Sequence, residues 1–162
     1  PGAAPRRYRD SGMQWVREGL AGPSETAGPD AFTRRALDQA AEDLAALIQQ
    51  LRPDAVIGYD DAGTYGHPDH VRAHHVTAEA CSRTGVPMVE VASVGTDEPS
   101  TGPADGFVWR DLPGTSEAVH RAVDAYRTQL TVVGDAPGGI AIRHVGGQDD
   151  VVALRTGLRL RR

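Results

Sequence analysis

The chain has 162 residues, 40% of them hydrophobic, which is enough for one compact domain with a sizeable core but includes no apolar run long enough to predict a membrane span. Its 17 basic residues are scattered among 22 acidic ones and leave a net charge of −5, so nucleic acid is not an expected partner. The single cysteine, Cys81, excludes an internal disulfide and fits a reducing, cytoplasmic compartment; its alanine-rich surroundings predict a buried structural thiol.

Residues 1–29 are rich in glycine, proline and arginine and predict an irregular segment. A helix is predicted to start at Asp30, a potential N-cap, and to end before Pro53. Its predicted apolar face consists of Phe32, Ala36, Ala40, Leu44, Leu47, Ile48 and Leu51. The run "DAVIGY" (Asp54 to Tyr59) then predicts a short strand that is buried on both faces.

A second helix is predicted from Pro68, which suits a first helical position, to about Arg83. "MVEVAS" (Met88 to Ser93) predicts the next strand. Strand, helix and strand with such short connections predict a βαβ unit with parallel strands, and hence an α/β fold. Ligands bind such sheets at the carboxyl ends of the strands, where the loop "DDAGTYGHPDH" lies.

The second half of the chain gives weaker signals. Residues 95–106 predict a surface excursion, and "FVWRDL" (Phe107 to Leu112) predicts a strand. A helix is predicted from Thr115 to Leu130, with Thr115 or Ser116 as its cap. The runs "GGIAI" and "DDVVAL" near the end predict edge strands.

Three histidines, His67, His70 and His74, form the only dense cluster of metal-ligating side chains in the sequence. Neutral imidazole is a good zinc ligand, and a catalytic zinc site takes about three protein ligands plus a water. The alternative is a capped helix start, with Pro68 in the first turn and the histidines on the surface. The position of the cluster after a strand favours a site, although His74, one turn into the helix, is expected to be solvated or to lie behind the ligands.

The stretch "RPDAVIGYDDAGTYGHPDHVRAHHVTAEA" (Arg52 to Ala80) resembles the second signature of the LmbE-like, or PIG-L, zinc-dependent deacetylases, which remove acetyl groups from N-acetylglucosaminyl substrates. "YRDSGM" (Tyr8 to Met13) resembles a further block found in members that act on small glucosaminides, such as those of the mycothiol pathway. The resemblance extends over most of residues 6–95. It implies a Rossmann-like three-layer α/β/α fold with a mostly parallel sheet, here as a single LmbE-like domain over residues 1–162.

The resemblance also implies roles for residues of the histidine loop. His70 corresponds to a zinc ligand, and His67 to the imidazole that stabilises the oxyanion of the tetrahedral intermediate. Asp69 would hold and tune a neighbouring histidine. Tyr65 would be a mobile polar contact to the reacting carbonyl.

In the first block, Asp10 would hydrogen-bond a sugar hydroxyl and Met13 would line the same pocket. The expected partner is therefore an N-acetylated amino sugar, with no nucleic acid and no membrane, and a homo-oligomer is possible. An amidase of the same family that cleaves a larger glucosaminyl conjugate is the alternative enzyme, and Met13, where leucine is more usual in it, favours the deacetylase. A catalytically inactive sugar-binding module of the same fold is the alternative outside the enzymes.

The family's AHPDDE motif, which supplies the other two zinc ligands and the catalytic base, does not occur in this sequence. The expectation is that the chain starts partway through the fold, with the opening βαβ region absent. Either it is part of a longer enzyme, which we favour, or it is a truncation with an incomplete metal site. His70 by itself cannot hold a catalytic zinc ion.

Overall fold

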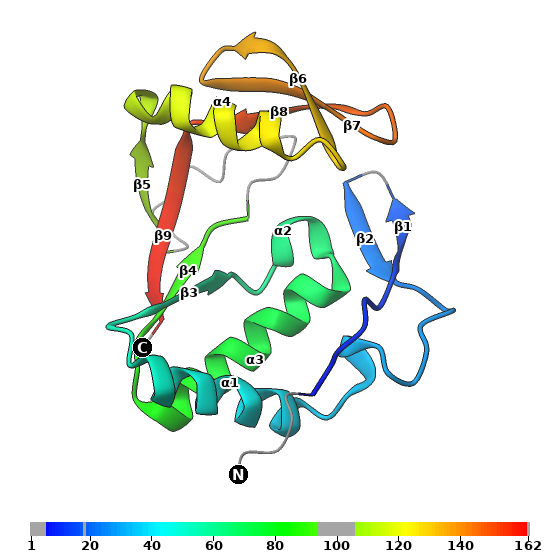
Figure 1. The fold of residues 1–162 in the computed structure, drawn as a ribbon, viewed down its shortest axis with the longest axis vertical. Helices are drawn as coiled ribbons and strands as arrows, with labels where there is room; N and C mark the ends of the chain where they lie inside the picture. Colours follow the sequence, from blue (N-terminus) through cyan, green and yellow to red (C-terminus); the bar gives the residue numbers. More distant parts are fainter. Residues whose placement is uncertain (1–5, 18, 94–105, 162) are drawn as a thin grey trace. The chain divides into compact units, whose positions relative to one another are not determined.

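The structure is a computed structural model that describes residues 6–17, 19–93 and 106–161. The chain divides into two compact units, Pro1–Asp105 with Leu158–Arg162, and Gly106–Gly157. Within the described part, no helix has the length and apolar character needed to cross a bilayer. The ribbon in Figure 1 follows the elements of each unit in chain order.

The first long helix begins later than the sequence predicts. A short 3-10 turn, η1 (Phe32–Arg34), is followed by extended backbone, and α1 spans Leu37–Leu51. Ala36 occupies the N-cap position without a side-chain cap, so the predicted cap at Asp30 is wrong. The Asp30 side chain instead pairs with Arg35, on the other side of the η1 turn.

The predicted βαβ unit is confirmed. Strand β3 (Val56–Tyr59) runs parallel to β4 (Met88–Val91), and α3 (Pro68–Thr84) connects them through the loop that contains the histidines. Strand β9 (Arg155–Arg161) lies on the other side of β4 in the antiparallel direction. The α/β class is therefore confirmed, but β3 and β4 are the only parallel pair among the described strands, since β9 pairs with β4 in the antiparallel direction.

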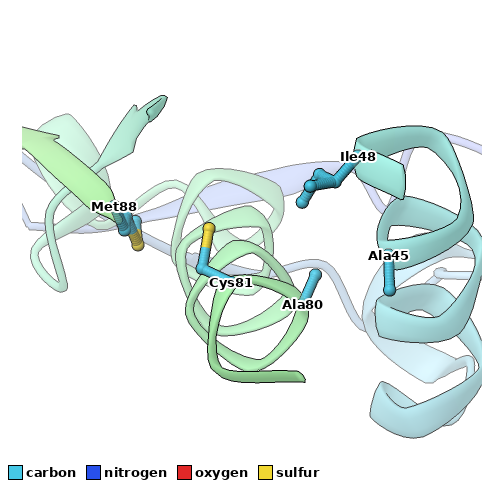
Figure 2. Packing of buried hydrophobic residues seen from close by; sticks show 5 residues of the cluster. All are labelled: Ala45, Ile48, Ala80, Cys81 and Met88. Atoms are coloured by element: carbon cyan, nitrogen blue, oxygen red, sulfur yellow. The ribbon is translucent and has the colours of Figure 1, made fainter. Parts of the chain in front are cut away.

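One face of this sheet is covered by helices. Figure 2 shows Ala80 and Cys81 of α3 between Met88 of β4 and the α1 residues Ala45 and Ile48. All five are buried, which confirms the structural role predicted for Cys81, and burial raises the pKa of its thiol. This cluster is the core on which the histidine loop is built.

The opposite face of the sheet is uncovered in the described residues. Ile57, predicted to be buried, is 68% exposed, and its neighbours across the sheet are Val89 and Leu160. Side chains alternate between the two faces of a strand, so the helices that bury Met88 leave Ile57 outside. The prediction of a strand buried on both faces is wrong here.

The N-terminal segment contains a β-hairpin that the composition did not predict. Strands β1 (Met13–Arg17) and β2 (Leu20–Pro23) pair in the antiparallel direction, with a register shift between Trp15 and Arg17. Residues of β1 do not alternate regularly between apolar and polar types, because Trp15 and Val16 are adjacent, and four of its five residues are exposed.

The second unit has its own small core. Strand β5 (Val108–Asp111) and the 3-10 turn η3 (Pro113–Thr115) lead into α4 (Ser116–Ala125). A three-stranded antiparallel sheet follows, in the order β6 (Leu130–Ala136), β7 (Gly139–His144), β8 (Asp149–Ala153). Val123, Ile140 and Ile142 form its buried core.

Three predictions for the second unit are corrected. The helix ends at Ala125, because the chain turns at Tyr126, and Thr115 makes no side-chain cap. The run "GGIAI" enters β7, which is the central strand and not an edge strand, whereas β8 is an edge as predicted. The predicted excursion at 95–106 lies almost entirely outside the described residues.

Candidate functional site

The histidine loop lies between the end of β3 and the start of α3. It contains a four-residue turn, α2 (Gly63–Gly66), and then His67 at the N-cap of α3 with Pro68 as the first helical residue. The Nδ1 atom of His67 accepts a hydrogen bond from the Asp69 N–H at 3.2 Å. The predicted helix start is therefore correct, and His67 itself is the cap.

Four rings meet in this loop. The His67 and His70 rings stack with centroids 4.5 Å apart, and Tyr59 stacks on His70 at 4.3 Å with an interplanar angle of 6°. The Tyr65 ring lies edge-on to both histidines, 6.0 Å from each. Both imidazoles are partly exposed, so they lie at the surface of the unit and not in packed core.

The surroundings shift two pKa values in this cluster. Burial, followed by the nearby His67, lowers the pKa of His70, while the Gly63 backbone and the Asp69 charge oppose this shift. Burial, followed by the neighbouring Tyr59, raises the pKa of Tyr65. At neutral pH His70 is therefore a neutral imidazole with an available lone pair, and Tyr65 is a protonated phenol that can donate.

The two sequence blocks meet through a single hydrogen bond. The backbone N–H of Ser11 donates to Asp69 Oδ2 at 2.9 Å, although the residues are 58 positions apart. Ser11 is buried, and its hydroxyl accepts hydrogen bonds from the N–H and the hydroxyl of Thr33. The Asp69 carboxylate thus anchors the "YRDSGM" block and makes no hydrogen bond to either ring in the described residues.

The predicted sugar-binding residues lie on either side of Ser11. Asp10 is exposed, and its Oδ1 accepts a hydrogen bond from the Gly12 N–H at 2.7 Å. Met13 is the first residue of β1 and is partly buried. The same hairpin contacts the histidine loop, since the Trp15 and Tyr65 rings lie 5.5 Å apart.

A zinc ion needs more ligands than this loop provides. Among the described residues, no group of three or more His, Cys, Asp or Glu side chains could hold a metal ion. Two features nevertheless suit a ligand set: the neutral imidazole of His70, and the buried Asp69 Oδ1, which has no hydrogen-bond partner there. The loop fits a contributor to a metal site and not a complete one.

Sequence reasoning missed a hydrogen-bond network beneath the loop. The buried Asp60 carboxylate binds the backbone N–H and the hydroxyl of Ser93, and the Thr64 N–H donates to Ser93 Oγ at 2.6 Å. The Thr64 hydroxyl lies 3.2 Å from His70 Nδ1. A signal was present, because Asp60 and Ser93 follow two parallel strands whose carboxyl ends meet at one edge.

His74 does not behave as a solvated histidine. It is 2% exposed, and its Nδ1 lies 3.0 Å from the Tyr59 carbonyl and 3.6 Å from Glu90 Oε1. The buried Glu90 carboxylate also pairs with Arg159 and Arg161 of β9. His74 therefore fixes the end of β3, next to the Tyr59 ring that stacks on His70.

Two surface depressions, of about 330 and 430 Å³, lie away from this chemistry. Their lining comes from Arg6, Arg7, Tyr8, Arg9, Asp30, Arg35 and Gln39. Neither includes a residue of the histidine loop, and we place the candidate site at the loop because the titratable groups and both sequence blocks meet there.

Comparison with known proteins identifies relatives of this chain. The family model described as PIG-L, GlcNAc-PI de-N-acetylase, matches residues 7–81. A 1D-myo-inositol 2-acetamido-2-deoxy-alpha-D-glucopyranoside deacetylase of Nocardioides sp. is 44% identical over 80 residues, covering 49% of this chain and 26% of the relative. The protein of the same name from Saccharomonospora viridis is 35% identical over 153 residues, covering 79% of this chain and 54% of the relative.

A third relative with this name, deacetylase 1 of Catenulispora acidiphila, is 34% identical over 154 residues, covering 92% of this chain and 42% of the relative. The chain thus spans between about a quarter and just over half of the length of these three relatives. The matched residues contain both blocks of the candidate site, and over residues 7–81 the chain belongs to the PIG-L family.

Proposed function

We propose that the protein is a zinc-dependent hydrolase that removes the N-acetyl group from a glucosaminide-type small molecule by hydrolysis of the amide. The observation that supports this proposal is the hydrogen bond between Ser11 and Asp69, because it joins the block that contains the proposed sugar-binding residues to the histidine loop. The names of the relatives support an N-acetylglucosaminyl inositol as the substrate to test. Since the chain spans only part of them, the proposed activity is that of the whole protein.

His70 is the proposed zinc ligand of this chain. Its lowered pKa supports the role, because a metal binds the neutral imidazole. Zinc, when bound, polarises the amide carbonyl and lowers the pKa of water. The proposal includes further ligands and a catalytic base from outside the described residues, since those residues contain no group of three ligands.

His67 is the proposed donor to the oxyanion. Because its Nδ1 accepts from the Asp69 N–H, the hydrogen of the neutral ring is on Nε2, where it can be donated. A donor aimed at a developing oxyanion is worth about 3–4 kcal/mol of transition-state stabilisation.

Tyr65 is the proposed second donor to the reacting carbonyl, and the raised pKa of its phenol keeps the hydrogen in place at neutral pH. For sugar binding we propose Asp10 and Met13. Asp10 Oδ1 accepts the hydrogen bond from the Gly12 N–H, and Oδ2 remains to accept one from a sugar hydroxyl. Met13 would pack against the sugar ring from the start of β1.

The three-layer, Rossmann-like architecture with a mostly parallel sheet, formed by residues 1–162 as one domain, remains part of the proposal. Such sheets carry helices on both faces. In the described residues α1 and α3 cover one face only, and the other exposes Ile57 and Leu160. A second helical layer would cover these apolar side chains.

The test is to incubate the purified protein with N-acetylglucosaminyl inositol, to measure the free amine and acetate released, and to determine its metal content. We expect deacetylation and about one zinc per chain. His70→Ala should abolish both, and His120→Ala on α4 is the matched control that should change neither. Cleavage only of a larger glucosaminyl conjugate would identify the amidase instead, and sugar binding without zinc would identify an inactive module.

A further inference from the structure

Thr64 has a backbone conformation that is rare for a residue with a side chain. Its φ of 69° and ψ of −88° lie near those of a γ-turn, and it sits inside the short α2 turn. Strain of this kind persists only where the surrounding structure holds the residue in place. Here the Thr64 N–H is held by Ser93 Oγ at 2.6 Å.

Ser93 is in turn held by the carboxylate of Asp60. Its backbone N–H donates to Asp60 Oδ2 at 2.6 Å, and its hydroxyl donates to Asp60 Oδ1. Because the Ser93 hydroxyl donates its hydrogen to the carboxylate, Ser93 Oγ has only lone pairs left. It can therefore accept the hydrogen bond from the Thr64 N–H. Asp60 also accepts from the Gly63 N–H at 3.2 Å, so one buried carboxylate fixes both the loop and the strand end.

The loop places the Thr64 hydroxyl next to the Nδ1 atom of the His70 ring. Thr64 Oγ1 lies 3.2 Å from His70 Nδ1, within hydrogen-bond distance. A hydroxyl oxygen has two lone pairs, so Thr64 Oγ1 can accept a hydrogen from Nδ1. Stacking on Tyr59 and His67 leaves the ring little freedom to turn.

We propose that Asp60, Ser93 and Thr64 are positioning residues that hold the neutral His70 ring with its hydrogen on Nδ1 and its lone pair on Nε2. A histidine that binds a metal through one nitrogen donates the hydrogen of the other to a fixed acceptor. We call the hydrogen-bonded chain of Asp60, Ser93 and Thr64 the relay. It provides His70 with this acceptor before any metal is present. The inference rests on the proposed function in one respect, which is that His70 is taken as a zinc ligand.

The tautomer of His70 is measured directly by long-range ¹H–¹⁵N correlation on the metal-free, ¹⁵N-labelled chain at about pH 8, where histidine is neutral. We expect the Nδ1–H form to dominate at His70. Thr64→Val, which keeps the shape and removes the hydroxyl, should lower the ratio of Nδ1–H to Nε2–H by roughly fivefold, the effect of about one hydrogen bond. Thr64→Ser should restore the ratio.

Two further variants separate positioning from damage to the fold. Ser93→Ala leaves Thr64 chemically intact and should shift the ratio in the same direction. Thr84→Val is the matched control, because its hydroxyl binds the Ala80 carbonyl at the far end of α3, and it should leave the ratio unchanged. Dispersed amide spectra show that each variant is folded.

An Nε2–H form in the unsubstituted chain would overturn the relay, as would an unchanged ratio in both Thr64→Val and Ser93→Ala. Neither result would bear on deacetylation, which is measured separately. Conversely, a Thr64-dependent Nδ1–H form in a protein with no deacetylase activity would support the relay and remove the proposed function.

Discussion

The N–H of Ser11 donates to the carboxylate of Asp69, and this bond of 2.9 Å joins two segments that are 58 residues apart. Ser11 lies between the proposed sugar-binding residues, and Asp69 lies between the two stacked histidines in sequence. The geometry of the candidate site therefore depends on this bond, together with the contact between the Trp15 and Tyr65 rings.

Removal of this carboxylate should destabilise the first unit. Asp69→Ala leaves the buried Ser11 N–H without an acceptor, and we expect the free energy of unfolding to fall by about 1–3 kcal/mol. Urea unfolding measures the change. Asp38→Ala is the control, because Asp38 is also an acidic residue in the first turn of a helix but is exposed; it should cost less than about 1 kcal/mol. Equal losses would mean that the bond to Ser11 contributes nothing.

His70 should make stability depend on pH. Burial and His67 lower the pKa of its imidazole in the fold, so below the ordinary histidine pKa of about 6.5 the unfolded chain takes up a proton more readily. The contribution of neutral His70 to the free energy of unfolding is therefore fully present above about pH 6.5. It is lost as the pH falls through the pKa of His70 in the folded state. Unfolding free energies measured at about pH 8 and 5 should show a smaller acid loss in His70→Asn than in the unsubstituted chain.

His120→Asn, on α4 of the second unit, is the control for this pH dependence and should leave the acid loss as it is in the unsubstituted chain. The same acid loss in His70→Asn as in the unsubstituted chain would contradict the assignment to His70.

The backbone at Thr64 should prefer glycine. Thr64→Ala and Thr64→Gly both remove the hydroxyl and differ only in Cβ, which is unfavourable at a φ of 69°. We expect the glycine variant to be the more stable by about 1–3 kcal/mol, as measured by urea unfolding. An alanine variant of equal stability would show that the turn is not strained.

The two faces of the βαβ sheet should tolerate truncation differently. Met88→Ala removes a side chain that is 2% exposed in the core with α3, and we expect a loss of about 2–5 kcal/mol. Ile57→Ala, on the uncovered face, should change stability by about 0.5 kcal/mol or less. Thermal or urea unfolding distinguishes the two variants, and a large loss for Ile57→Ala would mean that this face is covered in solution.

Local chemistry in the sequence was sufficient for the elements around the site. Proline at the first helical position, the apolar run before the loop and the second apolar run, "MVEVAS", predicted β3, α3, β4 and their parallel pairing. These signals are reliable because they act between residues close in sequence, through a fixed φ and through burial. The two blocks "YRDSGM" and "HPDH" likewise identified the family without any knowledge of how they are arranged.

Only the tertiary structure decided how these parts meet. The Ser11–Asp69 bond, the Tyr59 stack on His70 and the Asp60–Ser93–Thr64 network each join residues whose types, taken alone, are ordinary. The uncovered face with Ile57 and the antiparallel β9 were unpredictable for the same reason. Residue type fixes what a side chain can bond to, but which partner is within reach depends on packing between segments far apart in the chain.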